Sequence, residues 1–343
     1  MLKMGIIGMG KMGEFHAGWM TPQNQLQLVA VCEKSEKRIA DLKKKYPQLH
    51  YYTDVDEFLK KEDIDFAVVV TTHETHEELV VKVLNAGKNV IVEKPMSMTY
   101  ESTQRMVAAA EKNKKHLFVH QSSRWDRDFL LLKQMIQSGK LGEILCIQSK
   151  VTLCDEGWPQ WGIEGIQNPW RIKAQYGGGM LFDWGPHLVD EIMLLMVKDP
   201  IGVYGILQSG VWSKEVDDYF FAIMRYDNNV ICQIECSNNA RLPAPRWFVI
   251  GTKGTFIVHG KKDPVWADVE MYYQKDDGEK IHEKVELVGV TESGIEGGFY
   301  RDLVPFLEGK KKEFVSMYEA SKVVKILEMI KQSSEKNQFI SYK

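Results

Sequence analysis

The sequence predicts an α/β protein in which an N-terminal doubly wound parallel sheet is followed by a second α/β domain with a large open, mostly antiparallel sheet. Between residues 4 and 120, short apolar runs alternate with helical periods, as in repeated βαβ units. After residue 143, longer alternating strands are joined by short polar turns. A chain of 343 residues is long for one core, and we place the domains at 1–122 and 123–343.

The first domain is predicted to contain six strands and five helices. The hydroxyl of Ser35 can cap the second helix, and Gly87 can end the fourth. The predicted strands are Met4–Ile7, Leu28–Cys32, His50–Tyr52, Phe66–Val70, Asn89–Val92 and Leu117–His120. The predicted helices are Met12–Met20, Glu36–Tyr46, Val55–Lys60, Thr75–Ala86 and Tyr100–Lys115.

The second domain is predicted to begin with a helix at Phe129–Gln137. Two later helices, His187–Met196 and Met317–Lys331, carry apolar residues that require burial. The predicted strands are Glu143–Leu153, Val203–Gln208, Tyr219–Tyr226, Val230–Ser237, Trp247–Gly251, Thr255–His259, Val269–Gln274 and His282–Leu287. An open sheet has one face to cover, and a second subunit can cover it, so we expect a homodimer or homotetramer.

Composition excludes several classes of protein. A net charge of −3 provides no positive surface for nucleic acid. The five cysteines are odd in number and form no CxxC pair, which fits reduced thiols better than disulfides. No run approaches about 18 apolar residues, and the first strand at Met4–Ile7 leaves no room for a leader, so we expect a cytoplasmic protein that does not span a membrane.

A glycine-rich turn, Gly8-Met9-Gly10-Lys11-Met12-Gly13, directly follows the first strand and opens a helix. Gly8 permits the tight turn, Gly10 lets the backbone approach a pyrophosphate, and Gly13 allows close packing of helix on strand. The free N–H groups of the helix N-terminus favour phosphate, so Lys11 and Met12 join the predicted contacts. The pattern predicts a dinucleotide site, although a turn that merely needs glycine remains an alternative.

Glu33 ends the second strand, where an acidic side chain can bind the ribose hydroxyls of a dinucleotide. A carboxylate at this position repels a 2′-phosphate and favours NAD over NADP. Lys34 and Arg38 are close enough to reach such a phosphate, so NADP stays possible. The alternative is that Glu33 is a solvated strand end.

Glu93-Lys94-Pro95 follows the fifth strand. The proline holds the lysine in an extended conformation, in which its side chain can lie beside the reactive ring of a bound nicotinamide. The alternative is a strand-end ion pair. A second segment, Thr71-Thr72-His73-Glu74-Thr75-His76, follows the fourth strand, and ligands bind at such carboxyl ends. Its histidines lack the H-E-x-x-H spacing, so we predict no metal.

A glycine run, 177–179, leads into a predicted helix with Pro186 in its first turn. Asp183 and His187 are four residues apart and can point toward the same space, where the aspartate would fix the tautomer of the imidazole. A histidine so placed can take the proton of an alcohol. The alternative is that Asp183 caps the helix and His187 is a satisfied core histidine.

Aromatic and cationic residues are dense between residues 124 and 176. Aromatic faces pack on the C–H faces of sugar rings, and arginines donate to hydroxyls. The predicted substrate contacts in this segment are Arg124, Trp125, Trp161, Arg171 and Tyr176. The alternative is that the tryptophans fill the core or a subunit interface.

The chain resembles the Gfo/Idh/MocA family of oxidoreductases over essentially its whole length. The matching segments are Gly8–Gly13, Glu93–Pro95, Gln121–Trp125, Gly139–Gly142 and Gly178–His187. The resemblance implies a Rossmann domain that binds NAD(P), with Gln121 among the cofactor contacts, and a second domain that binds substrate. One departure lies at Thr72 and His73, where relatives usually carry proline and a small polar residue, whereas His76 matches.

The resemblance also implies oxidation of a hydroxyl on a sugar, glycoside or cyclitol, with no nucleic-acid partner. Lys94, Asp183 and His187 would form the catalytic trio, with His187 as base and Lys94 polarising the substrate oxygen, and Lys94–Pro95 is a candidate cis peptide. A glycoside-cleaving or cofactor-recycling enzyme that oxidises its substrate transiently is the main alternative. A third hypothesis is a non-catalytic NAD-binding protein, in which at least one residue of the trio would be replaced.

Overall fold

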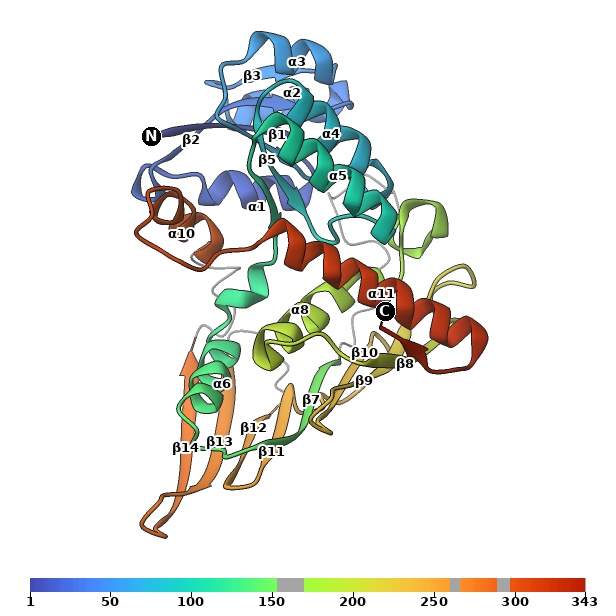
Figure 1. Cartoon of the computed structure of the whole chain (residues 1–343). Coiled ribbons are helices and arrows are strands. Elements are labelled where there is room, and N and C mark those ends of the chain that lie inside the picture. The colour runs from blue at the N-terminus through green and yellow to red at the C-terminus, as the bar shows by residue number, and fades with distance from the viewer. Residues whose placement is uncertain (153–169, 260–265, 289–296, 343) are drawn as a thin grey trace. The chain divides into compact units, whose positions relative to one another are not determined.

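The computed structural model describes residues 1–152, 170–259, 266–288 and 297–342 (Figure 1). The chain divides into two compact units. Among the described residues, 1–121 and 297–324 form the first unit, and the rest form the second. Residues 297–324 thus return to the first unit before the chain ends in the second, and the domain limits of 1–122 and 123–343 stay a prediction.

The first unit contains a six-stranded sheet in the order β3-β2-β1-β4-β5-β6, with every neighbouring pair parallel. The strands are β1 (Leu2–Ile7), β2 (Leu26–Cys32), β3 (His50–Tyr52), β4 (Phe66–Val69), β5 (Asn89–Glu93) and β6 (Leu117–His120). The continuous apolar runs are explained by burial on both faces, since every residue of β4 and β6 is buried. The predicted doubly wound sheet is confirmed, and its strand order reverses between β1 and β4, where ligands bind in such folds.

Five helices connect these strands, and two more come from the C-terminal part of the chain. The side chain of Ser35 accepts the Arg38 N–H, which confirms the predicted cap. The connecting helices are α1 (Lys11–Trp19), α2 (Glu36–Lys45), α3 (Val55–Lys61), α4 (His76–Asn85) and α5 (Tyr100–Asn113). The later ones are α10 (Gly298–Leu307) and the start of α11 (Met317–Lys336). The sequence patterns did not predict α10, because Pro305 lies inside it.

The second unit contains a nine-stranded sheet in the order β14-β13-β12-β11-β7-β10-β9-β8-β15. Among the strand pairs that the structure describes in this sheet, only β7 and β10 are parallel, so the predicted open, mostly antiparallel sheet is confirmed. Its strands are β7 (Ile144–Thr152), β8 (Gly202–Gln208), β9 (Tyr219–Arg225), β10 (Ile231–Ser237), β11 (Trp247–Gly251), β12 (Gly254–His259), β13 (Trp266–Gln274), β14 (Lys280–Val288) and β15 (Ile340–Ser341).

Three helices of the second unit carry residues of interest: α6 (Arg127–Gln137), α7 (Met180–Asp183) and α8 (Gly185–Met196). Helix α8 packs against β10, and its predicted burial nearly all round is confirmed. Short 3-10 turns at η3 (Ser122–Trp125), η5 (Trp170–Ile172) and η6 (Ala174–Tyr176) complete the described connections to these helices. Among the residues that the structure describes, no helix is both long and apolar enough to cross a membrane.

Asp217 anchors the turn that leads into α7. Its carboxylate accepts the Leu181 N–H at 2.8 Å, and its backbone carbonyl accepts the Met180 N–H at 3.0 Å. Gly179 has φ +102°, and a Cβ at this position would collide with the Asp217 carboxylate, so only glycine fits. Burial raises the pKa of Asp217 to about 7 although the Leu181 N–H favours the anion.

The raised pKa of Asp217 predicts a stability that falls as pH rises. The folded carboxyl keeps its proton above the unfolded pKa of about 3.9. Its contribution is therefore present below about pH 4 and is lost as the pH rises through about 7. We expect Asp217→Asn, which keeps a carbonyl acceptor for Leu181, to remove a decline on the order of 4 kcal/mol between these limits. Urea denaturation across this range measures it.

The control is Asp227→Asn, which changes an exposed carboxylate in a turn of the same unit. This variant should keep the wild-type dependence of unfolding free energy on pH. If Asp217→Asn kept that dependence as well, the raised pKa of Asp217 would be wrong.

Candidate active site

The three glycines of the first turn meet different surroundings, as their predicted roles require. Gly8 has φ +91°, and a Cβ there would collide with the Val70 carbonyl. A Cβ on Gly13 would lie 2.6 Å from the Gly8 carbonyl oxygen, so helix α1 approaches β1 only because this residue is glycine. A Cβ on Gly10 would meet nothing within 4 Å. No contact within the described protein explains the glycine at position 10, whereas a pyrophosphate lying against the backbone does.

The glycine-rich turn is braced from β2 and α2. The carboxylate of Glu33 accepts the Met9 N–H and the Ser35 N–H, each at 3.0 Å. Arg38 donates from Nε to the Met9 carbonyl at 3.0 Å and forms an ion pair with Glu14. Arg38 is therefore bound inside the protein, whereas Lys34 is exposed. The interactions of Glu33 and Arg38 with Met9 hold the turn in place around Gly10.

The segment after β4 is tied to the segment after β5. His76 is fully buried, with Nδ1 at 2.9 Å from the Pro95 carbonyl oxygen and Nε2 at 3.2 Å from that of Thr71. The Thr75 hydroxyl donates to Thr71 Oγ1 at 2.6 Å or to the Thr72 carbonyl at 2.8 Å. His76 thus joins the two strand ends that the sequence predicts to contact the nicotinamide. His73, the departure from the family pattern, is buried beside His76 with ring centroids 5.7 Å apart.

Lys94 follows the last residue of β5 and is half-buried. The Lys94–Pro95 peptide bond is cis, which confirms the expectation drawn from the resemblance. The Lys94 N–H donates to Oε2 of Glu93 at 3.0 Å. The position of the lysine backbone is therefore linked to the side chain of the residue before it.

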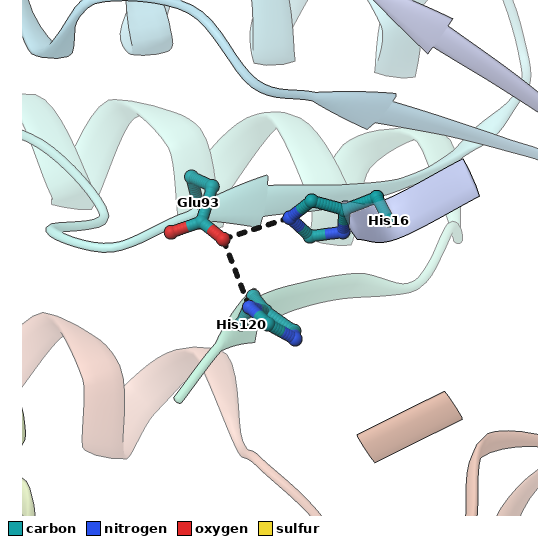
Figure 2. Close-up of side chains that lie close together, drawn as sticks. All are labelled: His16, Glu93 and His120. Atoms are coloured by element: carbon teal, nitrogen blue, oxygen red, sulfur yellow. Dashed lines mark hydrogen bonds and ion pairs between the residues drawn. The ribbon is translucent and has the colours of Figure 1, made fainter. Parts of the chain in front are cut away.

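Glu93 lies in a buried polar cluster that the sequence patterns did not reveal (Figure 2). Its Oε1 faces His16 Nε2 at 2.8 Å and His120 Nδ1 at 2.9 Å. The second ring nitrogen of His16, Nδ1, lies 2.5 Å from the Tyr300 hydroxyl. Burial alone would raise the pKa of Glu93, but the charge of His120 and the hydrogen bonds of both histidines hold that pKa well below its ordinary value.

Gln121 supplies a further test of the predicted cofactor site. Its side chain is buried, and Oε1 has no hydrogen-bond partner within the described protein. A buried amide oxygen without a donor is rare in folded proteins and calls for a ligand or water. Together with the open space at Gly10, this orphaned acceptor fits a bound dinucleotide with an amide group.

The second unit presents His187 in the first turn of α8. The ring is largely buried, and its Nδ1 lies 2.7 Å from the Ser123 hydroxyl, which sequence reasoning did not select. Asp183 ends α7 and lies 3.8 Å from Nε of Arg171. The structure thus brings a serine and the predicted base together, while the proposed effect of Asp183 on His187 stays a prediction.

Two buried ion pairs fix α8. Arg124, a predicted substrate contact, donates to both carboxylate oxygens of Asp190 at 2.7 and 2.6 Å. Arg246 Nη2 lies 2.8 and 2.6 Å from the two oxygens of Glu191, whose side chain is fully buried. Because these partners follow His187 by three and four residues, they hold the helix whose first turn carries that histidine.

The remaining predicted substrate contacts are only partly described. Trp125 is buried in η3, and Tyr176 is half-buried in η6. The Arg171 guanidinium lies over the Trp170 ring, 4.4 Å from its centroid. Trp161 lies outside the described residues. Lys94 belongs to the first unit, whereas Asp183 and His187 belong to the second.

Comparison with known proteins places both halves of the chain in one family. Residues 2–121 match an oxidoreductase family with an NAD-binding Rossmann fold, and residues 129–257 match the GFO/IDH/MocA C-terminal domain. A solved NAD-binding protein from Listeria innocua is 28% identical with a TM-score of 0.82, covering 99% of this chain and 96% of that one.

Similar curated proteins include two that are named for an activity on inositol and one that is uncharacterized. A myo-inositol 2-dehydrogenase from Thermotoga maritima is 30% identical over 78% of this chain and 75% of its own length. A scyllo-inositol 2-dehydrogenase (NADP(+)) from Bacillus subtilis is 26% identical over 99% of this chain and 95% of its own. An uncharacterized oxidoreductase, C115.03, from Schizosaccharomyces pombe is 33% identical over 63% of this chain, which spans only 58% of that protein.

The two family matches cover most of the chain, and the relative from Thermotoga maritima aligns over three quarters of its own length at 30% identity. The glycine-rich turn and the strand order of the first sheet agree with the Rossmann fold of the first match. The chain belongs to the GFO/IDH/MocA family of NAD-binding oxidoreductases.

Proposed function

We propose that the protein oxidises a secondary hydroxyl of a cyclitol, sugar or glycoside, with a nicotinamide dinucleotide as hydride acceptor. The observation that carries this proposal is the contact between His187 Nδ1 and the Ser123 hydroxyl, which holds the histidine ring at the start of α8. The same chain also contains the glycine-rich turn that Glu33 and Arg38 hold in place. The myo- and scyllo-inositol dehydrogenases among the relatives support a polyhydroxylated substrate.

His187 is the base in this reaction. A neutral imidazole accepts a proton at one nitrogen only while the other carries its own hydrogen. If Nδ1–H donates to Ser123 Oγ, the lone pair lies on Nε2, which takes the proton of the substrate hydroxyl. Once protonated, the ring donates from both nitrogens and keeps Ser123 as its partner. A serine can accept this bond in either charge state of the ring, so it holds the ring through the whole proton transfer.

Lys94 and Asp183 assist the proton transfer. The Lys94 ammonium stabilises the negative charge that develops on the substrate oxygen as its proton departs. The Asp183 carboxylate stabilises the positive charge that develops on the His187 ring. A nicotinamide dinucleotide held at the glycine-rich turn would supply the hydride acceptor.

Removing either proton-handling group should abolish most turnover and leave cofactor binding intact. We expect Lys94→Ala and His187→Asn each to lower turnover by about a hundredfold or more, the scale of a lost general acid or base. A panel of inositols, hexoses and glycosides with NAD, followed by NADH absorbance, measures turnover, and fluorescence titration with NADH measures binding.

The matched control is His282→Asn, an exposed histidine on β14 of the second unit, which should retain wild-type turnover. Full activity of His187→Asn at every pH would refute the base assignment. Release of an aglycone without net NADH would identify the cofactor-recycling alternative, and no turnover of any panel member by the wild type would refute the dehydrogenase.

NAD is the expected cofactor rather than NADP. The Glu33 carboxylate is held by two backbone N–H groups at the end of β2, where it repels a 2′-phosphate. The Arg38 guanidinium is already bound to Glu14 and the Met9 carbonyl, so it does not offset this charge for a phosphate. Lys34 remains exposed, and the relative from Bacillus subtilis is named for NADP(+), so the preference needs a direct test.

Neutralising Glu33 should weaken the preference for NAD. We expect Glu33→Gln to raise the affinity for NADP relative to NAD by about tenfold, equivalent to about 1.4 kcal/mol, because the amide keeps an acceptor but removes the charge. Parallel fluorescence titrations with NADH and NADPH measure the ratio. Glu36→Gln, an exposed change in the first turn of α2, should leave it unchanged, and equal affinities in the wild type would remove Glu33 from this role.

A homodimer or homotetramer would cover the open face of the second sheet. On this face Ile206 of β8 pairs with Phe221 of β9, and Ile206 and Ile231 are 39% and 41% exposed. Exposed apolar side chains on one face of a sheet favour burial against a second subunit.

A charge placed on this face should prevent association. We expect Phe221→Lys to sediment as a monomer, whereas Leu130→Lys, an exposed change on α6, should sediment like the wild type. Analytical ultracentrifugation at micromolar concentration measures the state. A monomeric wild type would refute the proposal.

A further inference from the structure

The buried cluster of His16, Glu93, His120 and Tyr300 has no role in the reaction described so far. It joins four elements of the first unit: His16 lies on α1, Glu93 ends β5, His120 ends β6, and Tyr300 lies on α10. All four residues are buried. A charged group in such a place requires an explanation, because an isolated buried carboxylate costs several kcal/mol.

The donors and acceptors of this cluster can be assigned in one consistent way. An ionised Glu93 only accepts, so His16 donates from Nε2 and His120 donates from Nδ1. Burial lowers the pKa of His16 and favours its neutral form, so Nδ1 of that ring accepts from the Tyr300 hydroxyl. The facing atoms satisfy one another by hydrogen bonds, so the three potential metal ligands His16, Glu93 and His120 need no ion to explain their approach.

Aromatic rings surround the cluster. Trp19 packs against His16 and His120 with ring centroids 5.5 Å apart in each case, and Phe299 lies 5.0 Å from His120. A Cβ at Gly297 would lie 2.5 Å from the Trp19 ring, so the backbone before α10 is in close contact with it. In surroundings that exclude water, hydrogen bonds to a charged carboxylate are strengthened and the arrangement is rigid.

The second oxygen of Glu93 provides the link to the site. Oε2 accepts the N–H of Lys94 at 3.0 Å, while Oε1 is held by the two histidines. His16 lies three residues after Gly13 on the helix whose first turn is the dinucleotide turn. The carboxylate of Glu93 therefore connects the backbone of Lys94 to the helix that begins at that turn.

We propose that His16, His120 and Tyr300 are positioning residues that act through Glu93 to hold Lys94 in register with the dinucleotide turn. This inference rests on the proposed role of Lys94 in proton transfer. Its physical basis is that a displacement of about 1 Å at a reacting group can lower a rate about a hundredfold. The cluster acts on the position of Lys94 and does not touch the substrate.

The test uses paired variants that remove or keep each donor. Leucine removes the donor in His16→Leu and His120→Leu. In His16→Gln, the glutamine amide can place an N–H where Nε2 of the histidine donates. In His120→Asn, the asparagine amide can place an N–H where Nδ1 of the histidine donates. We expect the leucine variants to lower kcat about tenfold or more with less than about a threefold change in NADH affinity, and the amide variants to recover most of kcat. A merely structural role predicts no such recovery.

A second readout does not depend on substrate. With selectively 15N-labelled lysine, the exchange rate of the Lys94 amide reports its bond to Glu93. We expect exchange to be about tenfold faster in the leucine variants, as for a lost hydrogen bond to a charged group, and near the wild-type rate in the amide variants. Tyr300→Phe, which keeps the ring and removes the hydroxyl, should increase the exchange rate of the Lys94 amide by a smaller factor. This variant supplies the test if a leucine variant does not fold.

The control for general destabilisation is Leu42→Ala, a buried truncation on α2 of the same unit. It should lower the melting temperature without changing kcat or Lys94 amide exchange. Unchanged exchange in folded leucine or Tyr300→Phe variants would overturn the proposal, as would equal damage from the leucine and amide variants. Stoichiometric metal in the purified protein that disappears with either histidine would also overturn it. If Lys94→Ala retains full turnover, the proposed function of Lys94 fails, while the exchange data still decide whether the cluster positions it.

Discussion

The constraint on which the first unit depends is the common direction of its strands. In a parallel sheet every strand delivers its carboxyl end to the same edge, so the segments that follow neighbouring strands meet there. Strands β1, β4, β5 and β6 are neighbours in the sheet. The glycine-rich turn, Thr71, Lys94 and Gln121 follow these four strands in turn. Residues about 110 positions apart in the chain are therefore brought to one edge by backbone pairing alone.

Parallel pairing brings the segments together, and buried polar contacts then set their positions. The ring nitrogens of His76 face the carbonyl oxygens of Thr71 and Pro95, to one of which the ring N–H donates, and Glu93 accepts the N–H of Lys94. Loops carry no regular hydrogen-bond ladder, so their backbone groups must find other partners if they are buried. Histidine suits this task because its neutral ring places one N–H donor and one acceptor nitrogen on a rigid frame. The abundance of buried histidine at this edge follows from that need and requires no metal.

In the second unit, buried ion pairs set the position of the helix that carries His187. Helix α8 is apolar over most of its surface, yet it buries Asp190 and Glu191. Each carboxylate has an arginine partner, Arg124 or Arg246, from another element. Removing one partner of such a pair leaves an uncompensated buried charge, so each pair has only one favourable arrangement. That requirement fixes the rotation of α8 about its own axis, and with it the direction in which His187 leaves the helix.

Local sequence signals predicted the parts of the fold that depend on neighbours in the chain. The turn from Gly8 to Gly13, the Ser35 cap and the apolar strands were predictable because their physical causes lie within a few residues. His16 and Tyr300 were not, because they are 284 positions apart and neither belongs to a periodic pattern. Helix α10 was missed for a related reason, since Pro305 interrupts its local signal while burial of Phe299 and Tyr300 sustains it.

The site shows the same division between local and distant causes. The positions of Lys94 and His187 could be selected from the sequence, whereas Ser123 could not, because only the folded backbone places its hydroxyl 2.7 Å from the ring of His187. Sequence reasoning gave the task of fixing the tautomer to Asp183, four residues away. A hydroxyl differs from a carboxylate in one important respect, since it can donate as well as accept. A carboxylate on Nδ1 would stabilise only the donor state of that nitrogen and would raise the pKa of the ring. A serine holds the ring in place with less effect on its charge than a carboxylate would have.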